Sequence, residues 1–412
     1  MKVNVAYLFC AQLFLMMVYA PLINGQEELF DFSNYDHFLQ ENVETGKIAG
    51  AVSLVSYKGT VVHDEAIGYN SLGDKTPMTS DKIFYLQSMT KPIVSVAFMT
   101  LYEQGLFTLS DPVSKYIPAF DSLKVIEVQY DAAGNMTGVE HVPLKRPILI
   151  WHLLSHTAGF SHGLGTNEYE ANLYKALYPE MEGNPTHEDI EGRVNVLLSY
   201  PLMGHPGEQW NYSASPDVLA LLIEKLSGKT AAEYLKEVIF TPLGMTSTGY
   251  NVSDDDLDRI VGLHRHDDTG TLVASPQWSP LQGNKIYGGT HGLFSTASDY
   301  LKFGEMLVNG GAYNGHRILS RKTLELMTKN FIEGLPYQPG QGFGLGFGVR
   351  TDLADSHLPG SVGNFYWSGL FCTYFFVDPV EDLVAVLMTQ SWPYSNYYGD
   401  MLRQFVYSSM KD

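Results

Sequence analysis

Strand-like segments lie near both ends of this 412-residue chain, and the stretch between them has a helical pattern. Residues 51–57 and 60–68 are apolar or β-branched runs separated by Lys58-Gly59, a pair that favours a tight hairpin turn. Similar short runs return at 344–350, 371–378 and 383–390. This order predicts an α/β (α+β) fold, in which one antiparallel sheet is built from both ends and flanked by helices, with a helical lobe inserted.

The helical lobe is predicted from apolar runs at 148–154, 217–226 and 231–239. We place the sheet lobe at about 26–105 and 285–412 and the helical lobe at about 106–284. A turn-rich stretch at 132–135 predicts an exposed hairpin within 123–147. A cleft between the two lobes is where a ligand is expected to bind.

Charge and the amino-terminal segment limit the possible partners. The formal net charge is −19, and no block of Lys or Arg could follow a phosphate backbone, so nucleic acid is not expected as a partner. Lys2 and the uncharged run that follows predict a signal peptide at 1–25, a mature chain at 26–412 and a secreted or periplasmic location. The alternative is an uncleaved membrane anchor, because the run approaches spanning length and Ile23 is a poor residue for a cleavage site.

Cys372 is the one cysteine in the predicted mature chain, so no internal disulfide can form there. Its neighbours are aromatic, and we therefore expect a buried thiol on a strand. Neither a metal nor an organic cofactor is expected.

Ser88 and Lys91 form an S-x-x-K motif just before a helical run at 92–104. Pro92 is tolerated only in the first turn of a helix, so Ser88 should lie at or just before the helix start. Positions i and i+3 then share one face, which places an amine beside an alcohol that needs a base to act as a nucleophile. The motif therefore indicates acyl transfer through a serine ester. The same spacing at Ser408 and Lys411 falls where the chain end is expected to fray.

Four more motifs follow the first one along the chain. They are L-L-S-H-T-A-G at 153–159, P-G-E-Q-W-N-Y-S at 206–213, P-L-G-M at 242–245 and G-L-F-S-T-A at 292–297. With S-M-T-K at 88–91, this set resembles the serine β-lactamase-related hydrolases, in particular class C β-lactamases and family VIII carboxylesterases. The resemblance implies a β-lactamase/transpeptidase-like fold.

The same resemblance implies roles for individual residues. Ser88 would be the nucleophile, Lys91 the cation or base beside it, and Tyr212 a second base. A buried Lys91 could hold Tyr212 partly as phenolate, which would take the Ser88 proton and return it to the leaving group. By the resemblance, the oxyanion would be held by the backbone N–H of Ser88 and that of Leu370.

Two departures from the family pattern bear on the substrate. Trp367-Ser368-Gly369 aligns with the K-T-G strand, so Trp367 replaces the lysine that holds a substrate carboxylate. Ala214 stands where the Y-x-N motif of β-lactamases has an asparagine. Both changes favour neutral or hydrophobic esters. The residues expected to contact substrate are Trp367, Ser368, Gly369, Leu370, Ala214 and His291.

These observations predict an exported serine hydrolase that cleaves carboxylic esters through a Ser88 acyl-enzyme, with a small-molecule ester or amide as substrate. Three alternatives stay open: a β-lactamase or D-amino-acid peptidase, an acyltransferase, and a non-catalytic penicillin-binding sensor. A membrane is expected as a partner only if the amino-terminal segment is retained, and the sequence indicates no oligomeric state.

Overall fold

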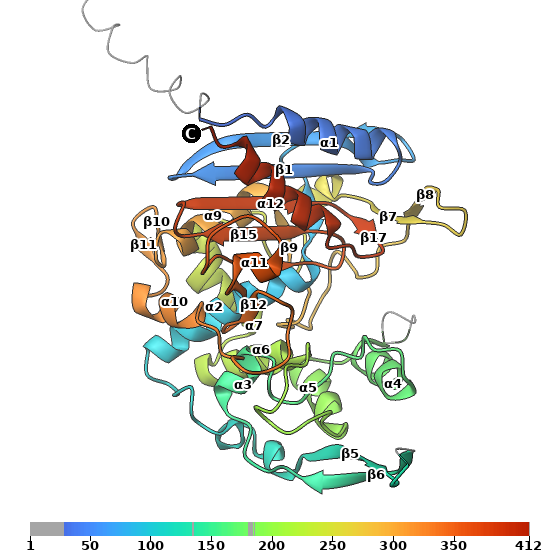
Figure 1. Cartoon of the computed structure of the whole chain (residues 1–412), viewed down its shortest axis with the longest axis vertical. Coiled ribbons are helices and arrows are strands. Elements are labelled where there is room, and N and C mark those ends of the chain that lie inside the picture. The colour runs from blue at the N-terminus through green and yellow to red at the C-terminus, as the bar shows by residue number, and fades with distance from the viewer. Residues whose placement is uncertain (1–28, 134–135, 180–183, 185, 412) are drawn as a thin grey trace, which may run out of the picture.

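The computed structural model describes residues 29–133, 136–179, 184 and 186–411. Its centre is an eight-stranded antiparallel sheet in the order β12, β13, β14, β15, β16, β1, β2, β3 (Figure 1). The strands are β1 (Gly50–Tyr57), β2 (Thr60–Ser71), β3 (Thr76–Pro77), β12 (Gln341–Phe343), β13 (Gly348–Arg350), β14 (Phe365–Ser368), β15 (Tyr374–Asp378) and β16 (Leu383–Met388). The sheet is thus built from both ends of the chain, as predicted.

The central strands are buried on both faces, which explains why they read as continuous apolar runs. Side chains along a strand point alternately to the two faces. On β16 one face presents Leu383, Ala385 and Leu387 to one hydrophobic cluster. The opposite face presents Val384 and Val386 to the larger cluster beneath the sheet.

One face is covered by α1 (Ser33–Glu44) and α12 (Tyr397–Ser409), which lie along the sheet in Figure 1. Backbone hydrogen bonds join the two ends of the described chain beside these helices. The Asp31 N–H donates to the Ser409 carbonyl at 2.8 Å, and the Lys411 N–H donates to the Leu29 carbonyl at 2.7 Å. The chain ends therefore close one layer of the fold.

The other face packs against α9 (Ala297–Val308) and the core helix α2 (Thr90–Glu103). All residues of α2 from 90 to 101 are buried, and Pro92 occupies its first turn as predicted. The further helices are α3 (Ile150–Leu154), α4 (Glu168–Leu177), α5 (Ile190–Ser199), α6 (Ser215–Ser227), α7 (Ala231–Leu235), α8 (Thr241–Leu243), α10 (Arg321–Met327) and α11 (Leu353–Ser356). Helices α3 to α8 thus fall between the two sheet-forming parts of the sequence.

The hairpin expected within 123–147 is confirmed as β5 (Lys124–Tyr130) and β6 (Met136–Pro143), at the edge of the molecule farthest from α1 (Figure 1). Gly134 and Asn135 at its turn lie outside the described residues. The remaining short strands are β4 (Ile83–Tyr85), β7 (Leu263–His266), β8 (Leu272–Ser275), β9 (Phe294–Thr296), β10 (Ala312–Tyr313), β11 (His316–Arg317) and β17 (Ser391–Trp392).

Two strand predictions began too early. The strand expected at 344–350 starts at Gly348, because 344–347 turn the chain from β12 to β13 and Gly346 has a φ of +98°. The strand expected at 371–378 starts at Tyr374. Cys372 is buried as expected, but it lies in the preceding turn with a φ of +62°, so it is not a strand residue. Left-handed backbone cannot continue a β-ladder.

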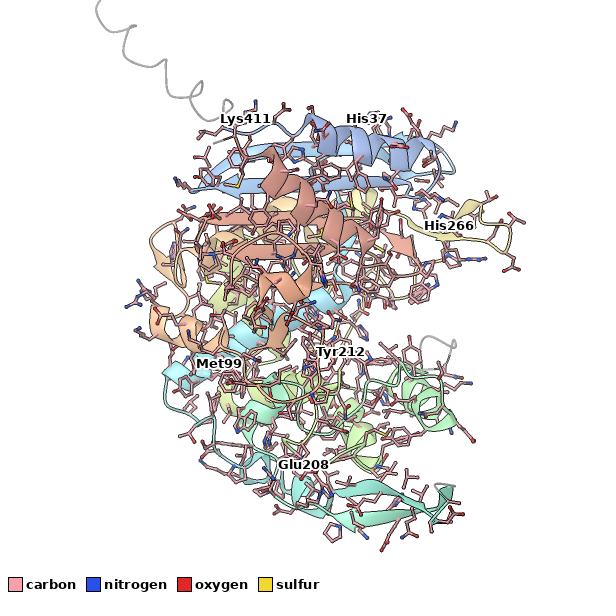
Figure 2. The ribbon with its side chains drawn as sticks, in the orientation of Figure 1. His37, Met99, Glu208, Tyr212, His266 and Lys411 are labelled. Carbon is pink, nitrogen blue, oxygen red and sulfur yellow. The ribbon has the colours of Figure 1, made fainter. Side chains whose placement is uncertain are left out.

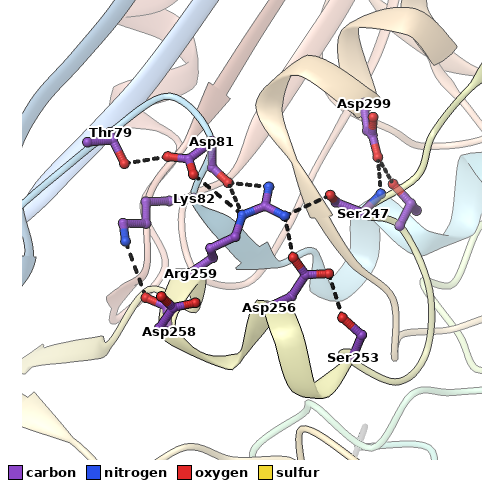
Figure 3. Close-up of polar contacts among 10 residues, drawn as sticks. Thr79, Asp81, Lys82, Ser247, Ser253, Asp256, Asp258, Arg259 and Asp299 are labelled. Atoms are coloured by element: carbon purple, nitrogen blue, oxygen red, sulfur yellow. Dashed lines mark hydrogen bonds and ion pairs between the residues drawn. The ribbon is translucent and has the colours of Figure 1, made fainter.

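Arg259 ties the segment after the inserted helices to the sheet lobe (Figure 3). Its Nε and Nη2 donate to the Asp81 carbonyl at 3.0 and 2.6 Å, and its Nη1 donates to Asp256 and to Ser247 Oγ. The Ser247 N–H in turn donates to Asp299 Oδ2 on α9 at 2.8 Å. These contacts anchor the segment to the chain leading into β4 and to α9.

Among the described residues no helix is both long and apolar enough to span a bilayer. The signal peptide predicted at 1–25 lies outside the described part of the chain.

Candidate active site

Ser88 lies in a single 3-10 turn, Gln87–Met89, between β4 and α2. Gln87 is buried with a left-handed φ of +50°, a conformation that costs a non-glycine residue about 1–3 kcal/mol. The Leu86 N–H donates to the Leu293 carbonyl at 2.9 Å and fixes the entry to this turn. The constrained turn places Ser88 directly before α2, as the sequence predicted.

Lys91 extends from the first turn of α2 toward Ser88. Its Nζ is 3.1 Å from Ser88 Oγ and donates to the Thr290 carbonyl at 2.8 Å. The residue is only 2% exposed. Burial lowers the pKa of Lys91 to about 7, while the charge of Asp217 opposes that shift. A large fraction of Lys91 is therefore neutral near pH 7, and a neutral amine can accept a proton from Ser88.

Tyr212 lies in the segment before α6 and reaches Ser88 from the other side. Its hydroxyl donates to Ser88 Oγ at 2.8 Å, and Lys91 Nζ lies 4.6 Å from the centre of its ring. Figure 2 places Tyr212 between the sheet and the helices below it. Ser88 Oγ is thus within hydrogen-bond distance of both groups that the sequence assigned to it.

The expected phenolate form of Tyr212 is not supported. Burial raises the pKa of Tyr212 far above its usual range, and the hydrogen bond between Tyr212 and Ser88 lowers it by a smaller amount. Tyr212 is therefore a neutral phenol that donates a hydrogen bond. Of the two groups beside Ser88, Lys91 is the one whose pKa suits a base near neutral pH.

Asp217 and Arg193 form a buried ion pair near Lys91, and the sequence did not reveal this pair. Asp217 is 1% exposed, and its Oδ1 accepts the Thr290 N–H at 2.8 Å. Arg193 Nη1 lies 4.0 Å from Asp217 Oδ2. Asp217 thereby positions the Thr290 carbonyl that binds Lys91. In the sequence it looks like an ordinary acidic residue of a helix first turn, because nothing local shows that it is buried.

Two backbone N–H groups are available to stabilise an oxyanion. In the described structure neither the Ser88 N–H nor the Leu370 N–H donates to another residue. Gly369 allows the two segments that carry these N–H groups to lie close together. A Cβ at this position would lie 2.3 Å from the Leu86 carbonyl oxygen and 2.2 Å from Thr373 Oγ1. Glycine thus lets the end of β14 approach the Ser88 turn, as an oxyanion hole requires.

Ser88 opens into a cleft of about 650 Å³ that is rich in aromatic residues. Trp367 on β14 packs against the Tyr212 ring at a centroid distance of 5.6 Å. Ser368 Oγ and the Tyr394 hydroxyl are 2.8 Å apart on the same wall. Trp367, Ser368, Gly369 and Leu370 all line the cleft, which is where the sequence expected substrate contacts.

His291 lies in a smaller hollow beside Ser88, with its Nδ1 3.1 Å from the Tyr85 hydroxyl. Burial holds the pKa of His291 well below its usual range, so it is a neutral ring in that wall. His162 lines the same hollow and stacks on Tyr212 with ring centres 5.3 Å apart. The sequence did not single out His162.

Ala214 is placed differently from the expectation. It is fully buried at the start of α6, and its N–H donates to the Ser161 carbonyl at 3.1 Å. It does not line the cleft beside Ser88, so the predicted substrate contact is wrong. The turn into α6 directs this position into the core instead.

Comparisons with known proteins match most of the chain. The profile of the family described as Beta-lactamase matches residues 35–404. Protein Rv1367c of Mycobacterium tuberculosis is 31% identical over 371 residues, covering 86% of this chain and 89% of that protein. Lovastatin esterase of Penicillium rubens is 32% identical over 285 residues, covering 67% of this chain and 68% of the esterase.

A solved structure, EstCE1, described as a hydrolase with promiscuous acyltransferase activity, has a TM-score of 0.73. It is 26% identical and covers 90% of this chain and 97% of its own. The similarity therefore includes the sheet and the inserted helices alike.

Proposed function

The chain belongs to the β-lactamase family of serine hydrolases, an enzyme family with esterase and acyltransferase members, and we propose that it cleaves carboxylic esters through a Ser88 acyl-enzyme. One observation carries the proposal: Ser88 Oγ lies 3.1 Å from a buried Lys91 amine and 2.8 Å from the Tyr212 hydroxyl. Family membership and the β-lactamase-like fold agree with the resemblance drawn from the motifs.

In the first step, neutral Lys91 takes the Ser88 proton while Oγ bonds to the ester carbonyl carbon. The carbonyl oxygen becomes negative and is held by the N–H groups of Ser88 and Leu370. As the ester C–O bond breaks, Tyr212 gives its hydroxyl proton to the leaving alkoxide and takes the proton held by Lys91. The products are a free alcohol and acyl-Ser88.

In the second step, water attacks the acyl carbon and gives a proton to Lys91. The bond to Ser88 Oγ then breaks, Oγ takes the proton back, and the acid leaves. An alcohol that attacks in place of water would yield a new ester by the same proton transfers. The description of EstCE1 as a hydrolase with promiscuous acyltransferase activity makes this the second candidate function.

The walls beside Ser88 support an ester over a β-lactam. Trp367 offers an indole where a β-lactamase-type lysine would hold a substrate carboxylate, and Tyr212, Trp210 and Tyr337 add aromatic surface to the same cleft. A charged hydrogen bond contributes about 1.5–3 kcal/mol, so its loss next to the nucleophile penalises a β-lactam.

The test uses 4-nitrophenyl butyrate and a chromogenic cephalosporin, with the wild-type chain and Ser88→Ala. We expect ester turnover by the wild type, none above background by Ser88→Ala, and little cephalosporin hydrolysis. Equal ester turnover by both proteins would disprove the role of Ser88, and rapid cephalosporin hydrolysis without ester turnover would reverse the substrate class. Adding a primary alcohol and measuring the new ester distinguishes transfer from hydrolysis.

We also propose that the chain is exported, from the composition of residues 1–25. Amino-terminal sequencing of the protein made in a secretion-competent host tests this. A new terminus near Gln26 outside the cytoplasm is expected, and an intact Met1 in the membrane fraction would indicate an anchor instead.

A further inference from the structure

Arg350 is a buried cation in the wall of the cleft that contains Ser88. It ends β13 and is 1% exposed. Its backbone is held by β14 and the chain before it: the Arg350 N–H donates to the Asn364 carbonyl at 2.8 Å, and its carbonyl accepts the Gly363 N–H at 2.8 Å. The side chain is therefore presented from a fixed strand.

The guanidinium of Arg350 lacks acceptors. Its Nε and Nη1 are buried and donate to no described residue. Behind it, Arg403 on α12 donates from Nε to the Tyr374 hydroxyl at 2.7 Å and from Nη1 to Asn364 Oδ1 at 3.0 Å. Arg403 Nη2 and Asn364 Nδ2 also have no partner among the described residues. Buried donors without acceptors are costly, so this cluster calls for an acceptor.

Two carboxylates lie near this cluster, but neither makes an ion pair with the guanidinium of Arg350 in the described structure. The guanidinium carbons of Arg350 and Arg403 lie 5.8 and 4.7 Å from the centre of the Tyr366 ring. Asp400 lines the same cleft and feels the charge of both arginines, but burial still raises the pKa of its carboxyl group. Asp378 is occupied by Tyr407 and by three backbone N–H groups.

The cluster is well separated from the nucleophile. Asn364, whose carbonyl accepts the Arg350 N–H, precedes Ser368 at the end of β14 by four residues, or about 13 Å of extended chain. Trp367 and Tyr366 point to opposite faces of that strand, yet both line the cleft. Ser88 and Arg350 therefore line the same cleft.

We propose that Arg350 binds a carboxylate that the substrate carries at a distance from its ester, so that the substrates are half-esters or esters with a remote acid group. A guanidinium N–H without a partner forms a charge-assisted hydrogen bond to a carboxylate, and burial strengthens it. This inference rests on the proposed ester cleavage. It differs from the lysine contact of β-lactamases, because that contact lies at the Trp367 position beside the nucleophile.

The test compares matched esters with and without the charge. In the first series, the mono-4-nitrophenyl esters of glutaric, adipic and sebacic acids are each compared with the diester in which the free acid is methylated. In the second series the free acid is on the alcohol side of the ester, in butyrate esters of ω-hydroxy acids. We expect the wild type to prefer the acid form in one series. Arg350→Met should reduce the ratio of kcat/KM between acid and capped forms by roughly 10- to 100-fold, with partial recovery in Arg350→Lys.

Asp400→Asn is the opposite-sign variant, because removing a competing negative charge should raise the same ratio. Asp400→Asn also tests the proposal if Arg350→Met does not fold. Ratios that are the same in the wild type, Arg350→Met and Asp400→Asn would overturn the proposal.

A binding measurement separates this proposal from the proposed function. Calorimetry with Ser88→Ala compares monomethyl sebacate with dimethyl sebacate, and Ser88→Ala with the double variant that adds Arg350→Met. Tighter binding of the acid that is lost with Arg350 supports the site even if no ester is turned over. Equal binding of the two ligands would overturn it even if esters are cleaved.

Discussion

Ser88 and Lys91 share a turn in the buried centre of the molecule, whereas Ser408 and Lys411, with the same spacing, lie at its surface. Lys91 is 2% exposed and its Nζ is 3.1 Å from Ser88 Oγ. The Lys411 side chain is 51% exposed and 3.9 Å from Asp31, near the outer edge of the sheet in Figure 2. Ser408 Oγ donates to the Phe405 carbonyl at 3.2 Å.

The backbone explains why the second pair does not meet. Helix α12 ends at Ser409, and Met410 is extended and forms a β-bridge with Phe30. Lys411 therefore leaves the helix before it can turn back to Ser408. In α2 the helix continues through Lys91, and the surrounding core removes its amine from water. The motif places a lysine three residues after a serine, and burial of that lysine lowers its pKa enough for it to act as a base.

The largest expected effect is that of removing the nucleophile. Ser88→Ala should lower kcat for 4-nitrophenyl butyrate by about 10⁴-fold or more, because no other group can form the acyl-enzyme. Ser408→Ala is the matched control and should stay within twofold of the wild type. Steady-state kinetics of both variants checks this prediction. A comparable loss of kcat in Ser408→Ala and Ser88→Ala would show that the two motifs do not differ in function.

Lys91→Met should lower kcat by about 10²- to 10⁴-fold, because it removes the base and keeps the volume of the side chain. Lys411→Met should have no measurable effect on the same reaction. Thermal unfolding of both variants shows whether they are folded. A folded Lys91→Met enzyme with wild-type kcat would rule out the amine as the base.

Tyr212→Phe should have a smaller effect, about 10- to 10³-fold in kcat, because it removes a proton donor to the leaving group while Lys91 stays in place. Its pH profile is the decisive measurement. The rising limb near pH 7 should remain if Lys91 is the base, whereas its disappearance in Tyr212→Phe would assign that limb to the phenol.

The smallest expected effect comes from Asp217→Asn. With the pKa of Lys91 near 7, kcat/KM should fall tenfold per pH unit below about pH 7, as Lys91 becomes protonated, and level off above it. The Asp217 charge raises the pKa of Lys91, so its removal should move the midpoint to lower pH. A midpoint that moves up, or stays in place in a folded variant, would contradict this coupling.

The sequence alone predicted the parts of the site that are written locally. Ser88 and Lys91 were found from their spacing and from Pro92, and Tyr212 from the motif that surrounds it. The sheet built from both ends was also predictable, because strand runs leave a local pattern. Turns were less accessible: Gly346 and Cys372 interrupt apolar runs that look like strand.

What only the tertiary structure decided is the environment of each group. Asp217, Thr290 and Lys91 come from separate parts of the chain, and no local pattern connects them. Burial made Tyr212 a neutral phenol and Lys91 a base, and it turned Ala214 away from the cleft. The sequence by itself determined which residues could react and at what spacing. Packing decided which of them lose water and acquire partners, because desolvation and hydrogen bonding depend on contacts between residues far apart in the chain.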